Sequence, residues 1–326
     1  MAEAPAPSIA EGPAPSRVEE SVPRPTQGLA PSPAQGPVGM IAGYGRPPFL
    51  VANGVRAAGR RLVVVGLKGL ASPWLMDRAD AHTWCGVTRL GHWAKALRRW
   101  GAKEVVMIGA VRKREIYSPL RFLRYIPDVR GAWLWYVKVR KDKRDNAVLL
   151  AVADELMSDG IELVSCVRYC GEHLAGAGVM TRNPVPRGME ADVEFGWRIA
   201  KASADLDVGQ CIAVRERDII AVEAIEGTDA MIRRAGRLCR TGGWTMIKVA
   251  RSRQDMRFDV PTIGPGTLRN LKNSRCVCLV VEAGKTLIVD KPTTLDLADK
   301  LGIAVIGIRA ESPAPPPQEK PSGGTG

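Results

Sequence analysis

The chain has 326 residues, more than the roughly 100–200 of a usual single domain, so we expect two domains. It is 45% apolar and 25% charged, which excludes a wholly disordered protein, and no apolar run reaches the roughly 20 residues of a membrane-spanning helix. The formal charge of +13 is concentrated in residues 112–144, which hold eleven Lys or Arg and three Asp or Glu. The N-terminus lacks the basic start and apolar stretch of a secretory signal, which predicts a cytoplasmic protein.

The chain begins and ends with segments rich in Pro, Ala, Ser and Gly. Residues 1–36 and 311–326 show no hydrophobic periodicity, which predicts two disordered tails. After the first tail, the expected elements are strands at 38–42, 61–67 and 104–108 and helices at 48–58 and 91–100. Strands separated by helices, with glycines between them, favour a parallel sheet with helices on its faces. Residues 37–165 are therefore predicted to form a Rossmann-like nucleotide-binding domain.

The basic segment 112–144 interrupts this rhythm and mixes its charges with Trp, Tyr and Phe. Three interpretations stay open: a solvated basic loop, a surface for anionic phospholipid headgroups, or a nucleic-acid patch. No signature of a nucleic-acid-binding module accompanies the segment, so we expect no nucleic-acid partner. Contact with a membrane surface remains among the expectations.

A second α/β domain, with a mixed sheet, is expected over residues 166–310. The elements leading into it and within it are helices at 145–160 and 191–206 and strands at 161–167, 211–214 and 219–225. The seven cysteines show no metal-ligand spacing, and the chain has three histidines. Any metal should therefore be bound by carboxylates, which favours Mg²⁺ or Mn²⁺.

Glycines mark the turn between the first expected strand and the first helix. Gly43 and Gly45 lie where backbone amides and the positive end of a helix can meet a phosphate or a nucleotide edge. The full dinucleotide fingerprint is not matched, because no glycine follows Gly45 at three residues. A tight turn without a ligand is the other interpretation.

Charged residues gather where the strand at 219–225 meets the following helix. They are Glu223, Glu226, Asp229, Arg233 and Arg234, around Gly227 and Thr228. In one interpretation Thr228 or Asp229 caps the helix and the acids face solvent. In the other, the carboxylates bind a divalent cation and the arginines bind phosphate.

A second charged cluster follows at residues 254–261. Polar and apolar residues alternate there, so an extended strand would place Asp255, Arg257 and Asp259 on one face. Pro261 ends that strand, and a glycine-rich turn at 262–267 opens a helix that could hold phosphate. An exposed edge strand would tolerate the same pattern. If both clusters lie at the carboxyl edge of one sheet they converge, which favours an active site.

Five stretches carry a family resemblance. They are GMIAGYGRPP at 39–48, LDVGQ at 206–210, VEAIEGTDAMIRR at 222–234, QDMRFDVPTIGPGT at 254–267 and VEAGKTLIVD at 281–290. In these stretches the chain resembles the UDP-2,3-diacylglucosamine pyrophosphatases of the LpxI type, from the lipid A pathway. The resemblance implies a Mg²⁺-assisted hydrolysis of UDP-2,3-diacylglucosamine to UMP and 2,3-diacylglucosamine 1-phosphate (lipid X). It also implies a UDP-binding N-terminal domain, a catalytic C-terminal domain that holds the acylated sugar phosphate, and a homodimer.

The resemblance assigns roles to particular residues. Its essential aspartate, in the D-x-P-T-I-G motif, is Asp259. The catalytic candidates are Asp255, Arg257 and Asp259, and the metal candidates are Glu226, Asp229 and Asp259. The substrate-binding candidates are Gly43, Gly45, Gly91, Asp207, Gln210, Gly227, Thr228, Arg233, Arg234, Lys248, Thr262 and Gly264. Gly91-His92 stands where family members often have Gly-Lys or Gly-Arg.

The leading hypothesis is thus a pyrophosphatase acting on a lipid-bearing UDP-sugar, in the cytoplasm or peripherally on the inner membrane. One alternative is a hydrolase or transferase for another nucleotide-sugar. A different class is a non-catalytic lipid carrier or membrane-surface protein, which the basic aromatic segment would suit.

Overall fold

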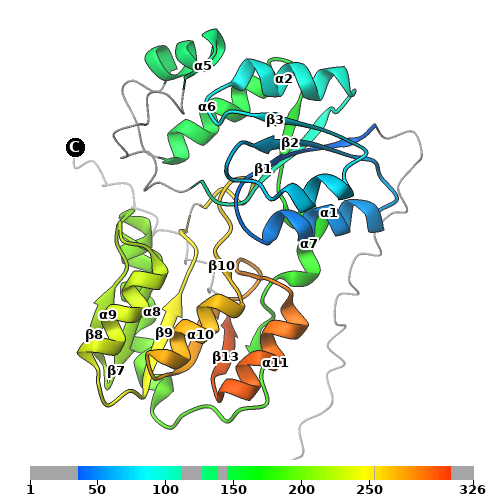
Figure 1. Cartoon of the computed structure of the whole chain (residues 1–326). Helices are drawn as coiled ribbons and strands as arrows, with labels where there is room; N and C mark the ends of the chain where they lie inside the picture. The colour runs from blue at the N-terminus through cyan, green and yellow to red at the C-terminus, as the bar shows by residue number, and fades with distance from the viewer. Residues whose placement is uncertain (1–35, 112–125, 139–144, 253, 310–326) are drawn as a thin grey trace, which may run out of the picture.

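A computed structural model describes residues 36–111, 126–138, 145–252 and 254–309. The chain forms two α/β units, the N-terminal one at the top of Figure 1 and the C-terminal one at the bottom. Both predicted tails lie outside the described residues except for Gly36, as do parts of the basic segment 112–144. None of the described helices combines the length and the apolar character that a bilayer crossing requires.

The N-terminal unit is built on a five-stranded parallel sheet. Its order is β3 (Ala81–Cys85), β2 (Leu62–Leu67), β1 (Val38–Ala42), β4 (Glu104–Ile108) and β5 (Glu162–Val164). Strands β1 and β2 are wholly buried, as expected of strands covered on both faces. The predicted Rossmann-like α/β arrangement is confirmed. Strand β3 was not predicted, because its Ala-His-Thr-Trp-Cys sequence has the partly polar, partly exposed character of an edge strand.

Helices cover both faces of this sheet. The helical elements are α1 (Pro47–Ala57), η1 (Pro73–Arg78), α2 (Leu90–Arg99), α5 (Val129–Trp133), the π-helical turn η2 (Leu134–Lys138), α6 (Asp145–Met157), α7 (Val167–Cys170) and η3 (Gly171–His173). One core packs α2 and α6 on the sheet, and a second packs α1 and α7 on its opposite face. The predicted helices at 48–58, 91–100 and 145–160 thus correspond to α1, α2 and α6.

The C-terminal unit has a six-stranded mixed sheet, as predicted. Its order is β6 (Gly178–Val179), β13 (Ala304–Ile308), β11 (Cys276–Glu282), β9 (Trp244–Lys248), β7 (Cys211–Arg215) and β8 (Asp218–Val222). Strands β9, β11 and β13 are parallel, whereas β7 runs antiparallel to both β8 and β9. Helix α8 (Met189–Asp205) covers one face, and α9 (Thr228–Leu238), α10 (Pro265–Asn273) and α11 (Lys291–Leu301) cover the other.

The two units share buried surface. Leu287 and Val289, at the two-stranded sheet of β10 (Thr262–Ile263) and β12 (Leu287–Ile288), pack into the α1–α7 core of the N-terminal unit. Helix α7 also belongs to this core, through Tyr169 and Cys170. The predicted boundary between residues 165 and 166 is therefore too early. It lies after α7, because that helix buries its apolar side chains against the N-terminal sheet.

The contact between α1 and α7 depends on Gly54. A Cβ atom at position 54 would lie 1.6 Å from the backbone oxygen of Tyr169. We predict that Gly54→Ala lowers the free energy of unfolding by about 1–3 kcal/mol, because backbone atoms cannot yield as a flexible side chain can. Urea denaturation would measure the loss. The matched control is Gly266→Ala in α10, where a Cβ meets nothing within 4 Å, and an equal effect of both changes would contradict the prediction.

Candidate active site in the C-terminal domain

Three chain segments meet at one edge of the C-terminal sheet. Because β7 is antiparallel to β8 and β9, the start of β7 lies beside the ends of the other two strands: Cys211 pairs with Lys248 and Ile212 with Val222. Glu223 follows directly, its amide donating to the Cys211 carbonyl at 2.8 Å. Helix α9 starts a few residues later at this edge. The topology therefore gathers polar side chains that are distant in the sequence.

The centre of this cluster is the buried side chain of Lys248. Its ammonium donates to the Thr228 hydroxyl at 3.2 Å, and that hydroxyl donates to the Glu223 carboxylate at 2.7 Å. Thr228 is the first residue of α9, so the start of the helix is tied to the end of β9. This series of hydrogen bonds, the Lys248–Thr228–Glu223 chain, holds the lysine side chain in one position.

Burial and charge act against each other on Lys248. Burial by itself lowers the pKa of a lysine, because it disfavours the charged form. The acidic groups of Cys211, Glu223 and Asp259 outweigh burial and raise the pKa of Lys248 above its ordinary value. Burial also raises the pKa of the Cys211 thiol to about 12, so at neutral pH the two carboxylates supply the charge. The ammonium therefore stays protonated in a partly desolvated place, where it attracts anions strongly.

Asp259 lies at the solvent side of this cluster. Its carboxylate accepts from the Gln210 amide nitrogen at 3.2 Å, and its backbone oxygen accepts from the Gln254 side chain at 2.6 Å. The Gln210 backbone amide donates to Glu223 at 3.3 Å, which joins Asp259 to the same network. The side chain of Asp259 is exposed, so a substrate or a water molecule can reach it. The structure thus brings Gln210, Thr228, Lys248 and Asp259 together.

The predicted extended strand at residues 254–260 is wrong. The segment forms a turn, in which the amides of Phe258 and Asp259 donate to the Asp255 carbonyl at 3.1 and 3.4 Å. The Asp255 carboxylate accepts from the Arg257 amide at 3.0 Å, a local bond that competes with a strand. Phe258 packs against the core of the N-terminal unit. The alternating pattern therefore belongs to a turn in which the apolar side chain of Phe258 packs on the N-terminal unit.

Asp255 and Arg257 pair with each other at the domain junction. Their carboxylate and guanidinium groups are 2.6 Å apart at the closest, and Arg257 also lies over the Phe258 ring. The hydrogen bond from Arg257 lowers the pKa of Asp255, and the Asp255 carboxylate raises the pKa of Arg257. Next to them, the Ser165 hydroxyl donates to the Met256 carbonyl at 2.7 Å. In the structure they pair with each other within the turn that contacts the N-terminal unit, an arrangement that favours a structural role over the catalytic role predicted for them.

The acidic residues around α9 do not converge. The Glu226 carboxylate contacts Arg234 at 2.5 Å, whose guanidinium also donates to the Val222 carbonyl at 2.6 Å. Asp229 instead accepts from the Asn270 amide at 2.9 Å. Within the described part of the chain, no group of three His, Cys, Asp or Glu side chains could hold a metal ion. The predicted set of Glu226, Asp229 and Asp259 does not fit a metal site formed by protein ligands alone.

The other C-terminal candidates lie around this edge with separate partners. The exposed Arg233 side chain donates to the Asp229 carbonyl at 3.1 Å and forms no ion pair with the described residues, so it can turn toward a ligand. Gly227 precedes α9 at φ +82°, a conformation that favours glycine. Asp207 forms an ion pair with Arg251.

Thr262 and Gly264 lead into α10. The Thr262 hydroxyl donates to the Val260 carbonyl at 2.8 Å, so it fixes the backbone that follows Asp259. Gly264 caps α10 with an extended backbone, and a Cβ there would lie 3.2 Å from that of Val289. Both residues therefore shape the turn between Asp259 and the helix.

On the N-terminal side, the glycine turn packs against a second glycine loop. A Cβ atom at Gly43 would lie 2.8 Å from the Gly109 carbonyl, and the Gly43 amide donates to the Ile108 carbonyl at 2.8 Å. Gly45 has φ +111°, which favours glycine. The loops after β1 and β4 are thus in backbone contact at the carboxyl edge of the sheet, the edge where open α/β folds bind ligands.

Gly91 lies in a different environment. A Cβ at this position would be 3.0 Å from the Asp128 carboxylate, which accepts from the His92 amide at 3.1 Å and the Gly131 amide at 2.8 Å. Burial raises the pKa of Asp128, but these hydrogen bonds outweigh it and the pKa is lowered. Asp128 already supplies the negative charge at the start of α2. Gly91 therefore allows α5 to pack closely on α2.

Comparison with known proteins finds a matching family model for each of the two units. Residues 37–173 match the family model of the LpxI N-terminal domain, and residues 176–306 match that of the LpxI C-terminal domain. A Caulobacter vibrioides protein named UDP-2,3-diacylglucosamine pyrophosphatase LpxI is 34% identical over 294 residues, which cover 87% of this chain and 99% of that protein. The chain belongs to the LpxI family. In this LpxI-family chain the limits of the two models agree with a boundary after α7.

Similarity to solved structures is weak. A UDP-glucose-4-epimerase from Stenotrophomonas maltophila aligns with 39% of this LpxI-family chain and 34% of its own, at 11% identity and a TM-score of 0.26. The biotin carboxylase domain of a single-chain bacterial carboxylase covers 63% of this chain and 55% of its own, at 16% identity and a TM-score of 0.20. TM-scores this low establish no shared overall fold.

Glu223 was grouped with Glu226 and Asp229 in the sequence of this LpxI-family chain but was assigned no role of its own. It was expected inside a strand that continues to residue 225, but β8 ends at Val222 and frees the carboxylate for Thr228 and Gln210. The signal available in the sequence was its position close to Glu226, Thr228 and Asp229. That pattern alone does not name its partners.

We predict that Asp255→Asn weakens the domain junction and leaves turnover intact. The pKa of Asp255 is lowered, so its stabilising contribution is complete above the ordinary value of 3.8 and is lost as the pH falls below it. The pair is partly exposed, so the loss at neutral pH should stay below about 1 kcal/mol and disappear in acid. Urea denaturation at several pH values would measure it. A large loss of turnover by a stable Asp255→Asn protein would contradict this assignment.

Proposed function

We propose that the chain hydrolyses the pyrophosphate bond of UDP-2,3-diacylglucosamine to UMP and 2,3-diacylglucosamine 1-phosphate. The observation that carries the proposal is the match over 99% of a relative named for this activity. The site geometry supports it, because a buried ammonium and an exposed carboxylate at one sheet edge suit a phosphate anhydride and an attacking water. The sheet that matches the LpxI N-terminal model would bind the UDP part at the Gly43 and Gly45 loop.

In this proposal Lys248 binds the phosphate next to the bond that is cleaved. Its ammonium is fixed by Thr228 and stays charged, so it can neutralise charge that develops on a phosphate oxygen without reorganising. The exposed guanidinium of Arg233, in the middle of the same helix, can add a second cation. The positive end of α9 acts in the same direction.

Asp259 is the proposed base. Its carboxylate, oriented by Gln210, accepts a proton from water as the water oxygen attacks phosphorus, and the bond to the leaving phosphate oxygen breaks. Because Asp259 lies outside the Lys248–Thr228–Glu223 chain, it can act on water while that chain holds the phosphate. The two groups therefore have separate roles.

Mg²⁺ is proposed to enter together with the substrate. Since Glu226 and Asp229 have other partners, the cation would take Asp259 as its protein carboxylate and phosphate oxygens as further ligands, the mode that Mg²⁺ commonly uses. When bound, it would reduce the repulsion between an attacking water and an anionic pyrophosphate. The homodimer stays a prediction.

We predict that Asp259→Asn and Lys248→Met both abolish most UMP release from UDP-2,3-diacylglucosamine. Loss of a general base should slow turnover about 100- to 10,000-fold, and loss of a preorganised cation about 100- to 1,000-fold. Chromatography of released UMP would measure both rates, and thermal unfolding would show whether each variant is folded. Asp218→Asn, an exposed aspartate at the far end of β8, is the matched control. A folded Asp259→Asn protein with full turnover would refute the proposal.

We predict that chelation by EDTA stops turnover and that added Mg²⁺ restores it. The reason is that the carboxylates of Glu223 and Asp259 already offset the charge of Lys248, which leaves much of the pyrophosphate charge to be balanced by a further cation. UMP release with and without EDTA would test this. Undiminished turnover in EDTA would leave Lys248 and the arginines as the only source of charge balance.

A further inference from the structure

Helix α5 and the turn η2 expose an unusual set of apolar side chains. They are Val129, Trp133, Trp135, Tyr136 and Val137, of which Tyr136 is 69% and Val129 89% exposed. Leu134 alone among residues 133–137 is buried, in the core beside Trp93 and Leu97. Single exposed apolar residues are normal, but a contiguous group marks an interaction surface. The inward Leu134 fixes this segment on the N-terminal unit and keeps its aromatic rings outside.

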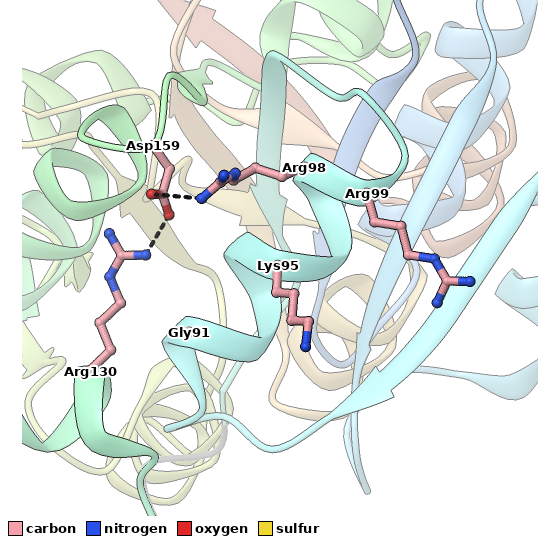
Figure 2. A pocket seen from close by; sticks show the side chains of 6 residues that line it. All are labelled: Gly91, Lys95, Arg98, Arg99, Arg130 and Asp159. Atoms are coloured by element: carbon pink, nitrogen blue, oxygen red, sulfur yellow. Dashed lines mark hydrogen bonds and ion pairs between the residues drawn. The ribbon is translucent and has the colours of Figure 1, made fainter.

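Cations adjoin these side chains. A hollow of about 530 Å³ is lined by Gly91, Lys95, Arg98, Arg99, Arg130 and Asp159. Figure 2 shows Arg98 and Arg130 converging on Asp159, whereas Lys95 and Arg99 extend away from it. Within the described ranges Lys95 and Arg99 are exposed and have no acidic partner. Two of these cations are therefore available to an anionic partner.

The aromatic and cationic groups share one surface. Helix α5 packs on the start of α2 through Asp128, and Lys138 lies 5.2 Å from the Trp133 ring centroid. Neither α2 nor residues 129–138 contains an Asp or Glu. In Figure 1, α5 lies at the end of the N-terminal unit that faces away from the C-terminal unit. This surface, residues 129–138 with α2, is named the α2–α5 surface.

We propose that the α2–α5 surface docks on a bilayer that contains anionic phospholipid. Trp and Tyr are favoured at the level of lipid headgroups, and each Lys or Arg near the surface adds attraction to anionic lipids. A nucleic acid could also bind to the cations and the aromatic rings. The exposed side chains of Val129 and Val137, however, suit contact with acyl chains better than contact with bases. A symmetric contact between two copies would bring like cations together. The proposal does not rest on the catalytic one, because binding needs no turnover.

Co-sedimentation of the full chain with vesicles tests this proposal. We expect binding to phosphatidylcholine vesicles that contain phosphatidylglycerol and much weaker binding to phosphatidylcholine alone. Trp135→Ser/Tyr136→Ser and Lys95→Glu/Arg99→Glu should each weaken binding at least about tenfold. Both double variants should keep the wild-type unfolding temperature and UMP release, since these side chains lie outside the cores and the candidate site.

Matched controls lie on other surfaces. Trp74→Ser removes an exposed Trp on η1, and Arg198→Glu/Arg237→Glu reverses two exposed charges on the C-terminal unit. These controls should bind vesicles like the wild type. Equal binding to both vesicle types, no vesicle binding, or equal loss in the controls would overturn the proposal. The proposal would also be overturned if the α2–α5 variants kept wild-type vesicle binding but changed in light-scattering mass or in RNA binding.

Discussion

A buried lysine ammonium requires compensating negative charge, and the candidate site is organised around this requirement at Lys248. The acidic groups of Cys211, Glu223 and Asp259 raise its pKa against the effect of burial. Thr228 carries the connection from the lysine to Glu223 and at the same time begins α9. The positions of a strand end, a helix start and a buried cation are therefore determined together.

The same segment that carries Asp259 also connects the two units. Phe258 packs against the N-terminal core, Ser165 holds the Met256 carbonyl, and Asp259 reaches back to Gln210 in the C-terminal unit. A change in the packing of one unit against the other would therefore move Asp259 relative to Lys248. Residues at the junction can influence catalysis in this way without touching the substrate.

Charge is used differently in the two units. In the C-terminal unit Lys248 lies in a place of low solvent access, where a cation attracts anions strongly. On the N-terminal unit Lys95 and Arg99 are exposed beside Trp and Tyr, where charge acts over a wide surface and is screened by salt. The cations of the two units therefore lie in different environments.

The sequence by itself determined the fold class, the helices and strands with strong periodicity, and the family. It could do so because hydrophobic periodicity and long motifs are local properties of the chain. Only the tertiary structure decided which polar residues meet. Strand β7 lies between β8 and β9 and runs antiparallel to both, which brings Glu223 close to Lys248. The packing of Phe258 on the N-terminal core gives its segment a turn where the sequence pattern predicts a strand. Partners of this kind are set by packing between distant segments, which alternation along one segment cannot reveal.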